Sequence, residues 1–295
     1  MKHVYISFLL ILSMTTQVLA QTTLKTDAHT LRPGDQHHFI LADKVKEGPA
    51  GYDQVWDFSN LKKKSEMKSK MLSAGFVKQS NEIPEANVVL EERGTHFFFD
   101  VSNQSMKQYG TITKNNTVIK YDKPFVKMVY PFEYGNSRSG DYAGRIISSK
   151  KERAFTGNYS IEVDGYGKLK LPGDVVVNDV VRLKTVKKKT YEGSSHTSTI
   201  VSYKWYCDQV RYPLLTIIKY QRPDKDHYIK TAYYADAGSI EQTKDAEKIS
   251  EETLKKASVK VFPNPFREQL TLEYQLTDKS DVEIIIYDSS GKKVK

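Results

Sequence analysis

The chain has 295 residues, of which 45 are Lys or Arg and 36 are Asp or Glu, so its formal net charge is +9 at pH 7. A chain of this length can bury a sizeable core, and its basic charge favours anionic neighbours such as an acidic glycan, lipopolysaccharide or nucleic acid. The single cysteine, Cys207, excludes an internal disulfide framework, so packing must hold the fold.

Residues 1–20 have the three parts of a secretory signal peptide. Lys2 precedes an apolar run at residues 4–12, and a more polar stretch then leads to the small side chain of Ala20. A membrane-spanning helix needs about 20 apolar residues, and this run is much shorter. We therefore expect export by the Sec machinery, cleavage between Ala20 and Gln21, and no integral membrane segment after processing.

Short runs of alternating apolar and polar residues fill the body, residues 21–237, and this pattern is typical of half-buried β-strands. The predicted fold is all-β, a large antiparallel sheet or sandwich. Predicted strands lie around Phe97 and Phe99 and at residues 159–163, 180–190, 197–206, 214–220 and 227–234. Turns are predicted at Asn115-Asn116, Asp164-Gly165, Pro172-Gly173, Glu192-Gly193 and Arg222-Pro223-Asp224.

The predicted strand at residues 197–206 shows the alternation most clearly. Val201, Tyr203 and Trp205 share one face, and Lys204 lies on the other. A tryptophan in such a strand could stack on a sugar, but it is more often a core anchor.

Trp56 has the same two interpretations, and a core anchor is again favoured. It lies in residues 51–61, GYDQVWDFSNL, which resemble a segment near the start of other secreted proteins. That resemblance implies no activity.

A candidate metal cluster near the N-terminus lacks the spacing of a zinc site. Adjacent histidines on a strand point to opposite faces, so His37 and His38 could not both bind one ion. We therefore predict no metal and no cofactor. The residues considered for this cluster are Asp27, His29, Asp35, His37 and His38.

Sequence motifs for hydrolysis are absent, since no Gly-x-Ser-x-Gly elbow or His-Glu-x-x-His pair occurs. A glycosidase needs two facing carboxylates, which Glu133 and Asp164 could supply across a sheet. Acids beside turn glycines more often stabilise turns, so no catalytic residue is predicted.

The lysine run at residues 187–189 ends an alternating strand, so Lys188 faces away from its two neighbours. A charged edge strand that protects against aggregation is the simplest interpretation. The two lysines that share a face could instead touch an anion. Because basic residues are scattered among acids along the chain, an ordinary solvated surface is favoured over a dedicated anion site.

Residues 238–258 are charged and lack aromatic side chains, which predicts a linker that contains a short exposed helix. The tail, residues 259–295, has three apolar segments. A Pro-Asn-Pro turn follows the first segment, and the third segment ends in a Tyr that is followed shortly by Ser-Gly. This tail resembles the type A sorting domain of type IX secretion cargo, a family found in Bacteroidetes. The motif residues are Pro263, Asn264, Pro265, Tyr287 and Gly291.

The resemblance implies an Ig-like β-sandwich that directs cargo across the outer membrane through the type IX secretion machinery. Because the sequence ends at Lys295, before the family's final strands, we expect an incomplete Ig-like domain. The predicted location is periplasmic, cell-surface or extracellular. The predicted function is a non-enzymatic binding or structural module, and the alternative is an extracellular hydrolase that acts on glycans.

Overall fold

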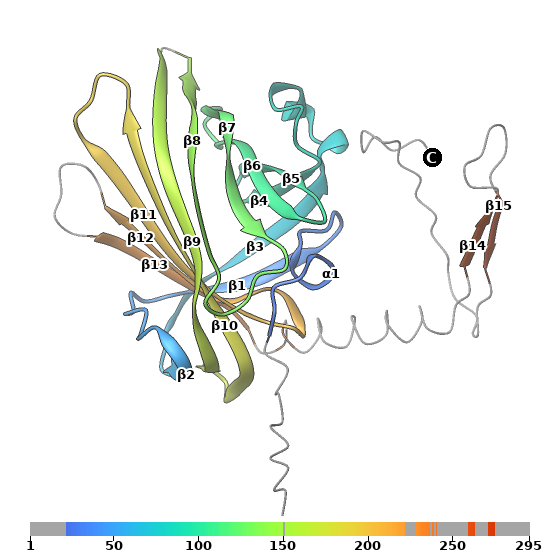
Figure 1. Cartoon of the computed structure of the whole chain (residues 1–295), viewed down its shortest axis with the longest axis vertical. Helices are drawn as coiled ribbons and strands as arrows, with labels where there is room; N and C mark the ends of the chain where they lie inside the picture. Colours follow the sequence, from blue (N-terminus) through green and yellow to red (C-terminus); the bar gives the residue numbers. More distant parts are fainter. Residues whose placement is uncertain are drawn as a thin grey trace, which may run out of the picture.

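The computed structural model describes residues 22–149, 151–221, 228–236, 238, 240, 259–262 and 271–274. Within these residues, twelve strands form a closed antiparallel barrel (Figure 1). Their order around the barrel is β10, β11, β12, β13, β1, β3, β4, β5, β6, β7, β8, β9, and β9 pairs back with β10. The barrel strands are β1 (Gln36–Ala42), β3 (Lys63–Ser73), β4 (Val88–Glu92), β5 (Thr95–Val101), β6 (Ser105–Ile112), β7 (Val118–Val129), β8 (Ser137–Ser148), β9 (Lys151–Leu171), β10 (Val175–Tyr191), β11 (Thr197–Cys207), β12 (Val210–Gln221) and β13 (Tyr228–Ala235).

The prediction of an all-β, antiparallel body is confirmed, but the sheet closes on itself instead of remaining open or dividing into a sandwich. β1 closes the barrel, because it lies between β13 and β3 and pairs with both. Phe39 of β1 is opposite Ala235 on one side and Met67 on the other. Local alternation predicts strands but contains no information about such distant partners. Closure leaves each barrel strand with two neighbours.

Three of the predicted turns have the backbone that a tight reversal needs, since Asn116, Gly173 and Gly193 have φ values of 59°, 81° and 70°. The turn predicted at Asp164-Gly165 is wrong, because β9 continues through it to Leu171. Gly165 instead leaves room for the ring of Trp56 to pack against β9, since a Cβ there would lie 2.7 Å from that ring. The turn predicted at residues 222–224 lies outside the described residues.

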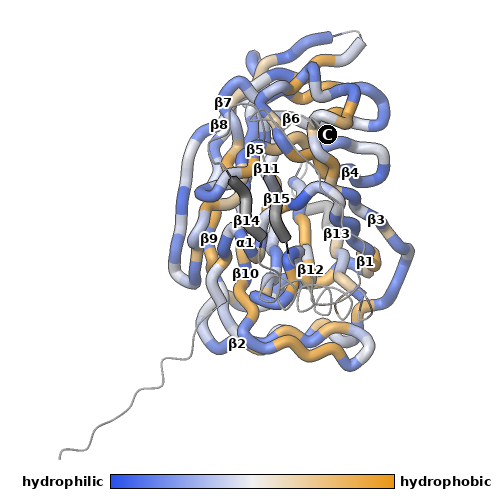
Figure 2. Tube along the Cα trace, turned by 90° about the vertical axis from the view of Figure 1, so that its right-hand side faces the viewer, coloured by the Kyte–Doolittle hydropathy of each residue, from blue (hydrophilic) through white to orange (hydrophobic). Residues whose placement is uncertain are grey.

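The inner wall of the barrel is identified by side chains that meet although their strands are not neighbours. Lys187 of β10 lies over the rings of Tyr121 and Phe125, which belong to β7. An aromatic cluster fills the interior around them, and it includes Phe99 of β5 and Tyr206 of β11. Hydrophilic and hydrophobic residues alternate along the strands, as Figure 2 shows, so each strand presents a second face to the outside.

Residues 43–62, which connect β1 to β3, pack on the outside of the barrel, and we call them the clasp. The clasp contains β2 (Gly51–Asp57), which pairs in parallel with the end of β9. Trp56 of the clasp lies edge-on to Trp205 of β11, with the ring centroids 5.9 Å apart, and the two residues are 2% and 0% exposed. Both tryptophans are therefore core anchors, as predicted.

A buried ion pair lies between the clasp and the barrel wall. The guanidinium of Arg182 donates to both carboxylate oxygens of Asp164, from Nε over 2.7 Å and from Nη2 over 3.0 Å. Its Nη1 donates to the backbone carbonyls of Glu47 and Gly48 in the clasp, over 2.9 and 3.1 Å. The central carbon of the Arg182 guanidinium also lies over the ring of Trp56, 5.5 Å from the ring centroid. Arg182 thus joins two neighbouring strands and the clasp in one network.

One short helix, α1 (Thr26–His29), precedes β1, and two others, η1 (Ala74–Phe76) and η2 (Lys78–Glu82), connect β3 to β4. In the predicted linker, Ile240 is 2% exposed and belongs to the core cluster that contains Trp205. In the predicted tail, β14 (Val259–Phe262) and β15 (Thr271–Tyr274) pair as an antiparallel two-stranded sheet. The rest of the linker and of the predicted Ig-like tail lies outside the described residues.

Candidate functional site

The structure does not assemble the candidate metal cluster. His37 is buried on β1 and His38 is exposed, so the two rings point to opposite faces, as predicted. Burial lowers the pKa of His37 to about 3. The ring of His29 contacts backbone atoms of Lys25 and Cys207. Across the described ranges, no group of three or more His, Cys, Asp or Glu residues could hold a metal ion.

The two carboxylates considered for a glycosidase have separate environments. Both oxygens of Asp164 accept hydrogen bonds from Arg182, and the Asp164 residue is 8% exposed. Glu133 is exposed in the turn that follows the cis Tyr130-Pro131 bond, where its backbone N–H donates to Asn136. Asp164 is therefore committed to the structural ion pair.

The lysine run at residues 187–189 does not lie on an edge strand. β10 is flanked by β9 and β11, so the edge-strand prediction is wrong. The predicted alternation is confirmed, because Lys187 and Lys189 lie over aromatic rings whereas Lys188 is exposed. Closure of the barrel has turned two members of a charged run into its interior.

Three lysines of the inner wall form what we call the lysine cluster: Lys127 on β7, Lys187 on β10 and Lys204 on β11. The charge of Lys127 contributes to the lowered pKa of both Lys187 and Lys204, so Lys127 lies near enough to act on both. Glu92 opposes this effect by raising the pKa of Lys127 and Lys204. In the part of the chain that the structure describes, neither Lys127 nor Lys204 forms an ion pair.

Lys187 is surrounded by aromatic side chains. Its Nζ lies 4.7, 4.3 and 4.5 Å from the ring centroids of Tyr121, Phe125 and Tyr142, and it donates to the Tyr121 hydroxyl over 2.8 Å. Burial, with the charges of Lys127 and Lys189, lowers the pKa of Lys187 well below its ordinary value. The ring faces act in the opposite direction, since they favour a cation.

Lys204 lies beside a fully buried hydroxyl, that of Thr216. Burial, with the charge of Lys127, lowers the pKa of Lys204 to about 7. Thr216 of β12 is directly opposite Lys204 in the strand pairing and is 0% exposed. Its Oγ1 has no hydrogen-bond partner of normal geometry among the described residues, although it is near enough to lower the pKa of Tyr233, which burial raises. The inner wall therefore offers the interior a lysine beside a fully buried hydroxyl that interacts with Tyr233.

Solvent reaches this part of the inner wall. Lys127, Lys187 and Lys204 are all half-buried, although they face the interior of a closed barrel. Along β11, Ile200 is 38% exposed near the β10–β11 hairpin, whereas Tyr206 at the opposite end is 4% exposed. The inner face of β11 is therefore more exposed to solvent near that hairpin, which lies at the upper end in Figure 1, than at its other end.

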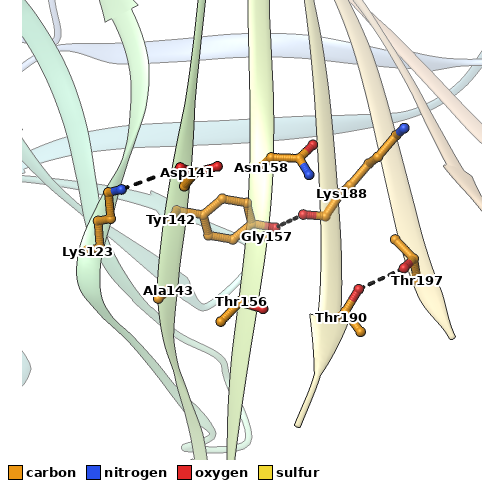
Figure 3. A pocket seen from close by; sticks show the side chains of 10 residues that line it. All are labelled: Lys123, Asp141, Tyr142, Ala143, Thr156, Gly157, Asn158, Lys188, Thr190 and Thr197. Carbon is orange, nitrogen blue, oxygen red and sulfur yellow. Dashed lines mark hydrogen bonds and ion pairs between the residues drawn. The ribbon is translucent and has the colours of Figure 1, made fainter. Parts of the chain in front are cut away.

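A separate depression of about 520 Å³ lies over the outer face of β8, β9 and β10 (Figure 3). Four of its polar groups already bind one another: Thr190 is hydrogen-bonded to Thr197 over 2.7 Å, and Lys123 pairs with Asp141 at 3.7 Å. These satisfied surface groups make a weaker site than the lysine cluster.

The lysine cluster predicts a dependence of stability on pH. The unfolded chain binds a proton at Lys204 up to about pH 10.4, whereas the folded chain loses it near pH 7. Because the unfolded state then binds more protons, Lys204 by itself should raise the free energy of unfolding from pH 7 to pH 9, by at most about 1.4 kcal/mol per pH unit. Lys204→Met should remove much of this rise, as measured by urea unfolding across that range. Lys188→Met, on the outer face of β10, is the control, and parallel profiles for wild type and Lys204→Met would contradict the prediction.

Lys127, Lys204 and Thr216 did not stand out in the sequence. Alternation places Lys204 and Trp205 on different faces of the strand, but it does not say which face points into the barrel. The available signal was the pair Lys187 and Lys189 on one face of a strand.

Residues 260–295 match the family model described as the secretion system C-terminal sorting domain, which is typical of secreted cargo of Bacteroidetes. The predicted resemblance is confirmed, and it indicates export to the outer membrane surface or the exterior. It also implies an interaction with the type IX secretion machinery. No curated protein and no solved structure matches the chain.

The predicted cleavage site, Ala20 and Gln21, and the motif residues of the tail lie outside the described residues, so their roles remain predictions. No helix in the described part of the chain is long and apolar enough to cross a membrane.

Proposed function

We propose that the exported body is a non-enzymatic binding protein that takes an anionic ligand at the lysine cluster of its inner wall. The observation that carries this proposal is the lysine cluster, in which half-buried lysines from three strands lie on the inner wall and Glu92 raises the pKa of Lys127 and Lys204. A lysine is rarely buried without a counter-charge, because removing an ammonium group from water is costly. A bound anion would supply the missing charge.

The charge of the whole chain supports the same ligand class. The acidic glycans and lipopolysaccharide expected from the net charge both carry carboxylate or phosphate groups that could enter the site. The alternative, a glycan hydrolase, depended on Glu133 and Asp164. Since Arg182 occupies both oxygens of Asp164, no observation favours that alternative.

A matched pair of fluorescent probes tests the proposal. 8-Anilinonaphthalene-1-sulfonate is anionic, and N-phenyl-1-naphthylamine has the same rings without the charge. We expect the mature chain to bind the sulfonate at one site, at least tenfold more tightly than the neutral probe, and more tightly at pH 6.5 than at pH 9. A charge-assisted hydrogen bond contributes about 1.5–3 kcal/mol, so Lys127→Met with Lys204→Met should weaken sulfonate binding at least tenfold.

Lys188→Met is the matched control, because Lys188 lies on the same strand as Lys187 but faces outward. It should bind the sulfonate as wild type does. Circular dichroism checks that each variant is folded, and Lys204→Gln replaces the double variant if it is not. Equal affinity for the two probes, or an equal loss in Lys188→Met, would overturn the proposal.

A further inference from the structure

Two β-bulges flank the end of β9, one on β2 and one on β10. On β2, Tyr52 and Asp53 together lie opposite the single residue Tyr166 of β9, and Asp53 has a φ of 55°. On β10, the register shifts between Val177 and Val180, and Asp179 in this bulge has a φ of 53°. A bulge re-aims the side chains of its extra residue and its neighbours. Each bulge therefore brings an aspartate to the same stretch of β9.

Both carboxylates act on the hydroxyl of Tyr166, which lies on the strand between them. This hydroxyl donates to Asp179 over 2.6 Å. The hydrogen bond raises the pKa of Tyr166 to about 12, and the charge of Asp53 acts in the same direction. Asp53 is exposed and forms no hydrogen bond or ion pair with the rest of the described chain. It is therefore available to a ligand.

An exposed aromatic ring lies on Tyr166. The ring of Tyr52 stacks on it, with the centroids 5.0 Å apart and the planes at 26°, and Tyr134 lies beside Tyr52 at 5.7 Å. Tyr166 is 8% exposed, whereas Tyr52 is 57% exposed. Because Tyr166 covers one face of the Tyr52 ring, the exposed area belongs to the other face and the edge. The stack therefore presents the negative face of an aromatic ring to solvent.

We propose that Tyr52, Asp53 and Asp179 form a binding site for a quaternary ammonium group, at the surface where the clasp meets β9. The methyl groups of the cation lie on the free face of Tyr52, whose quadrupole attracts positive charge. Asp53 and Asp179 add Coulomb attraction from beside the stack. This ligand is opposite in charge to the one proposed for the lysine cluster, so the two proposals are tested independently.

A matched pair of small molecules tests the role of charge. Choline carries the quaternary ammonium group, and 3,3-dimethylbutan-1-ol has the same shape without the charge. We expect the mature chain to bind choline at least fivefold more tightly than the alcohol, as measured by saturation-transfer NMR titration, and 1 M sodium chloride should weaken the binding of choline. Equal affinities would overturn the proposal. Tighter binding of methyl glucoside than of choline would assign the ring to a sugar and would also overturn it.

Four variants test the named residues. Tyr52→Leu keeps an apolar side chain, and Asp53→Asn keeps a residue that tolerates the left-handed backbone. Each should weaken choline binding at least threefold. Lys168→Met should strengthen it, because Lys168 lies two residues after Tyr166 on the same face of β9 and opposes a cation there. Asp174→Asn, at an exposed residue with a φ of 58° just before β10, is the matched control and should bind choline as wild type does.

Nitration of the wild-type chain locates the site without a substitution. Tetranitromethane modifies accessible tyrosines, and choline should protect Tyr52 but not the half-buried Tyr109 of β6, as read by peptide mass mapping. Circular dichroism checks that each variant is folded. Wild-type affinity in folded Tyr52→Leu and Asp53→Asn, or choline binding without protection of Tyr52, would overturn the site.

Discussion

Asp164→Asn should lower the free energy of unfolding by about 3–5 kcal/mol, the usual cost of removing one partner of a buried ion pair. Arg182 is 1% exposed, and its charge would remain between the clasp and the barrel wall without a carboxylate. Its contacts with the carbonyls of Glu47 and Gly48 cannot replace the lost charge. Urea unfolding of the mature chain, followed by tryptophan fluorescence, measures this loss, because Trp56 and Trp205 lie beside the pair.

A double variant separates the unpaired charge from the loss of shape. Asp164→Asn combined with Arg182→Met removes both charges, and replacing a whole buried pair is often close to neutral. We expect the double variant to regain most of the stability lost by Asp164→Asn alone. If Asp164→Asn costs less than about 1 kcal/mol, water reaches the pair and the clasp does not seal it.

Gly157→Ala should cost about 3 kcal/mol, at the upper end of the range for overpacking a core. Gly157 lies on the inner wall of β9 beneath the ring of Tyr142. An added Cβ would be 2.2 Å from the backbone oxygen of Lys188 and 2.5 Å from the ring. Because the nearest atom belongs to the backbone of β10, the two strands would have to separate. Thermal and urea unfolding both report the change.

Gly140→Ala provides the comparison, because its Cβ would meet the hydroxyl end of Tyr159 at 2.5 Å and no backbone atom is among its nearest contacts. Movement of a side-chain end relieves such a contact more easily than movement of a strand. We therefore expect a smaller loss for Gly140→Ala. Equal losses for the two variants would contradict the explanation based on strand separation.

Much of the fold could be predicted because strand patterns are local. Alternation identified β11 and its apolar face, and the glycines at positions 173 and 193 marked real turns. Asp164-Gly165 failed as a turn for a physical reason. The glycine leaves room for the ring of Trp56, and Trp56 lies more than a hundred residues earlier in the chain.

The candidate site could not be predicted, because the usual rule for sheet faces is reversed on β11. The apolar face, with Tyr203 and Trp205, points outward and is buried beneath the clasp. The polar face, with Lys204, points into the barrel. A sequence shows that the two faces differ, but only the position of the clasp decides which one is inside. The sequence shows Lys187 as part of a charged run, and closure of the barrel gives it its aromatic surroundings.

The pairing of β1 with β13 also governs the timing of maturation. The first strand of the barrel cannot complete its hydrogen bonds until Ala235 has been made, because its partner is the last strand. At ordinary synthesis rates that interval is roughly 10–40 s. Pairings this distant also slow folding itself, since a long loop must close before any contact forms. The barrel therefore cannot close during this interval, although β1 can already pair with β3 on its other side.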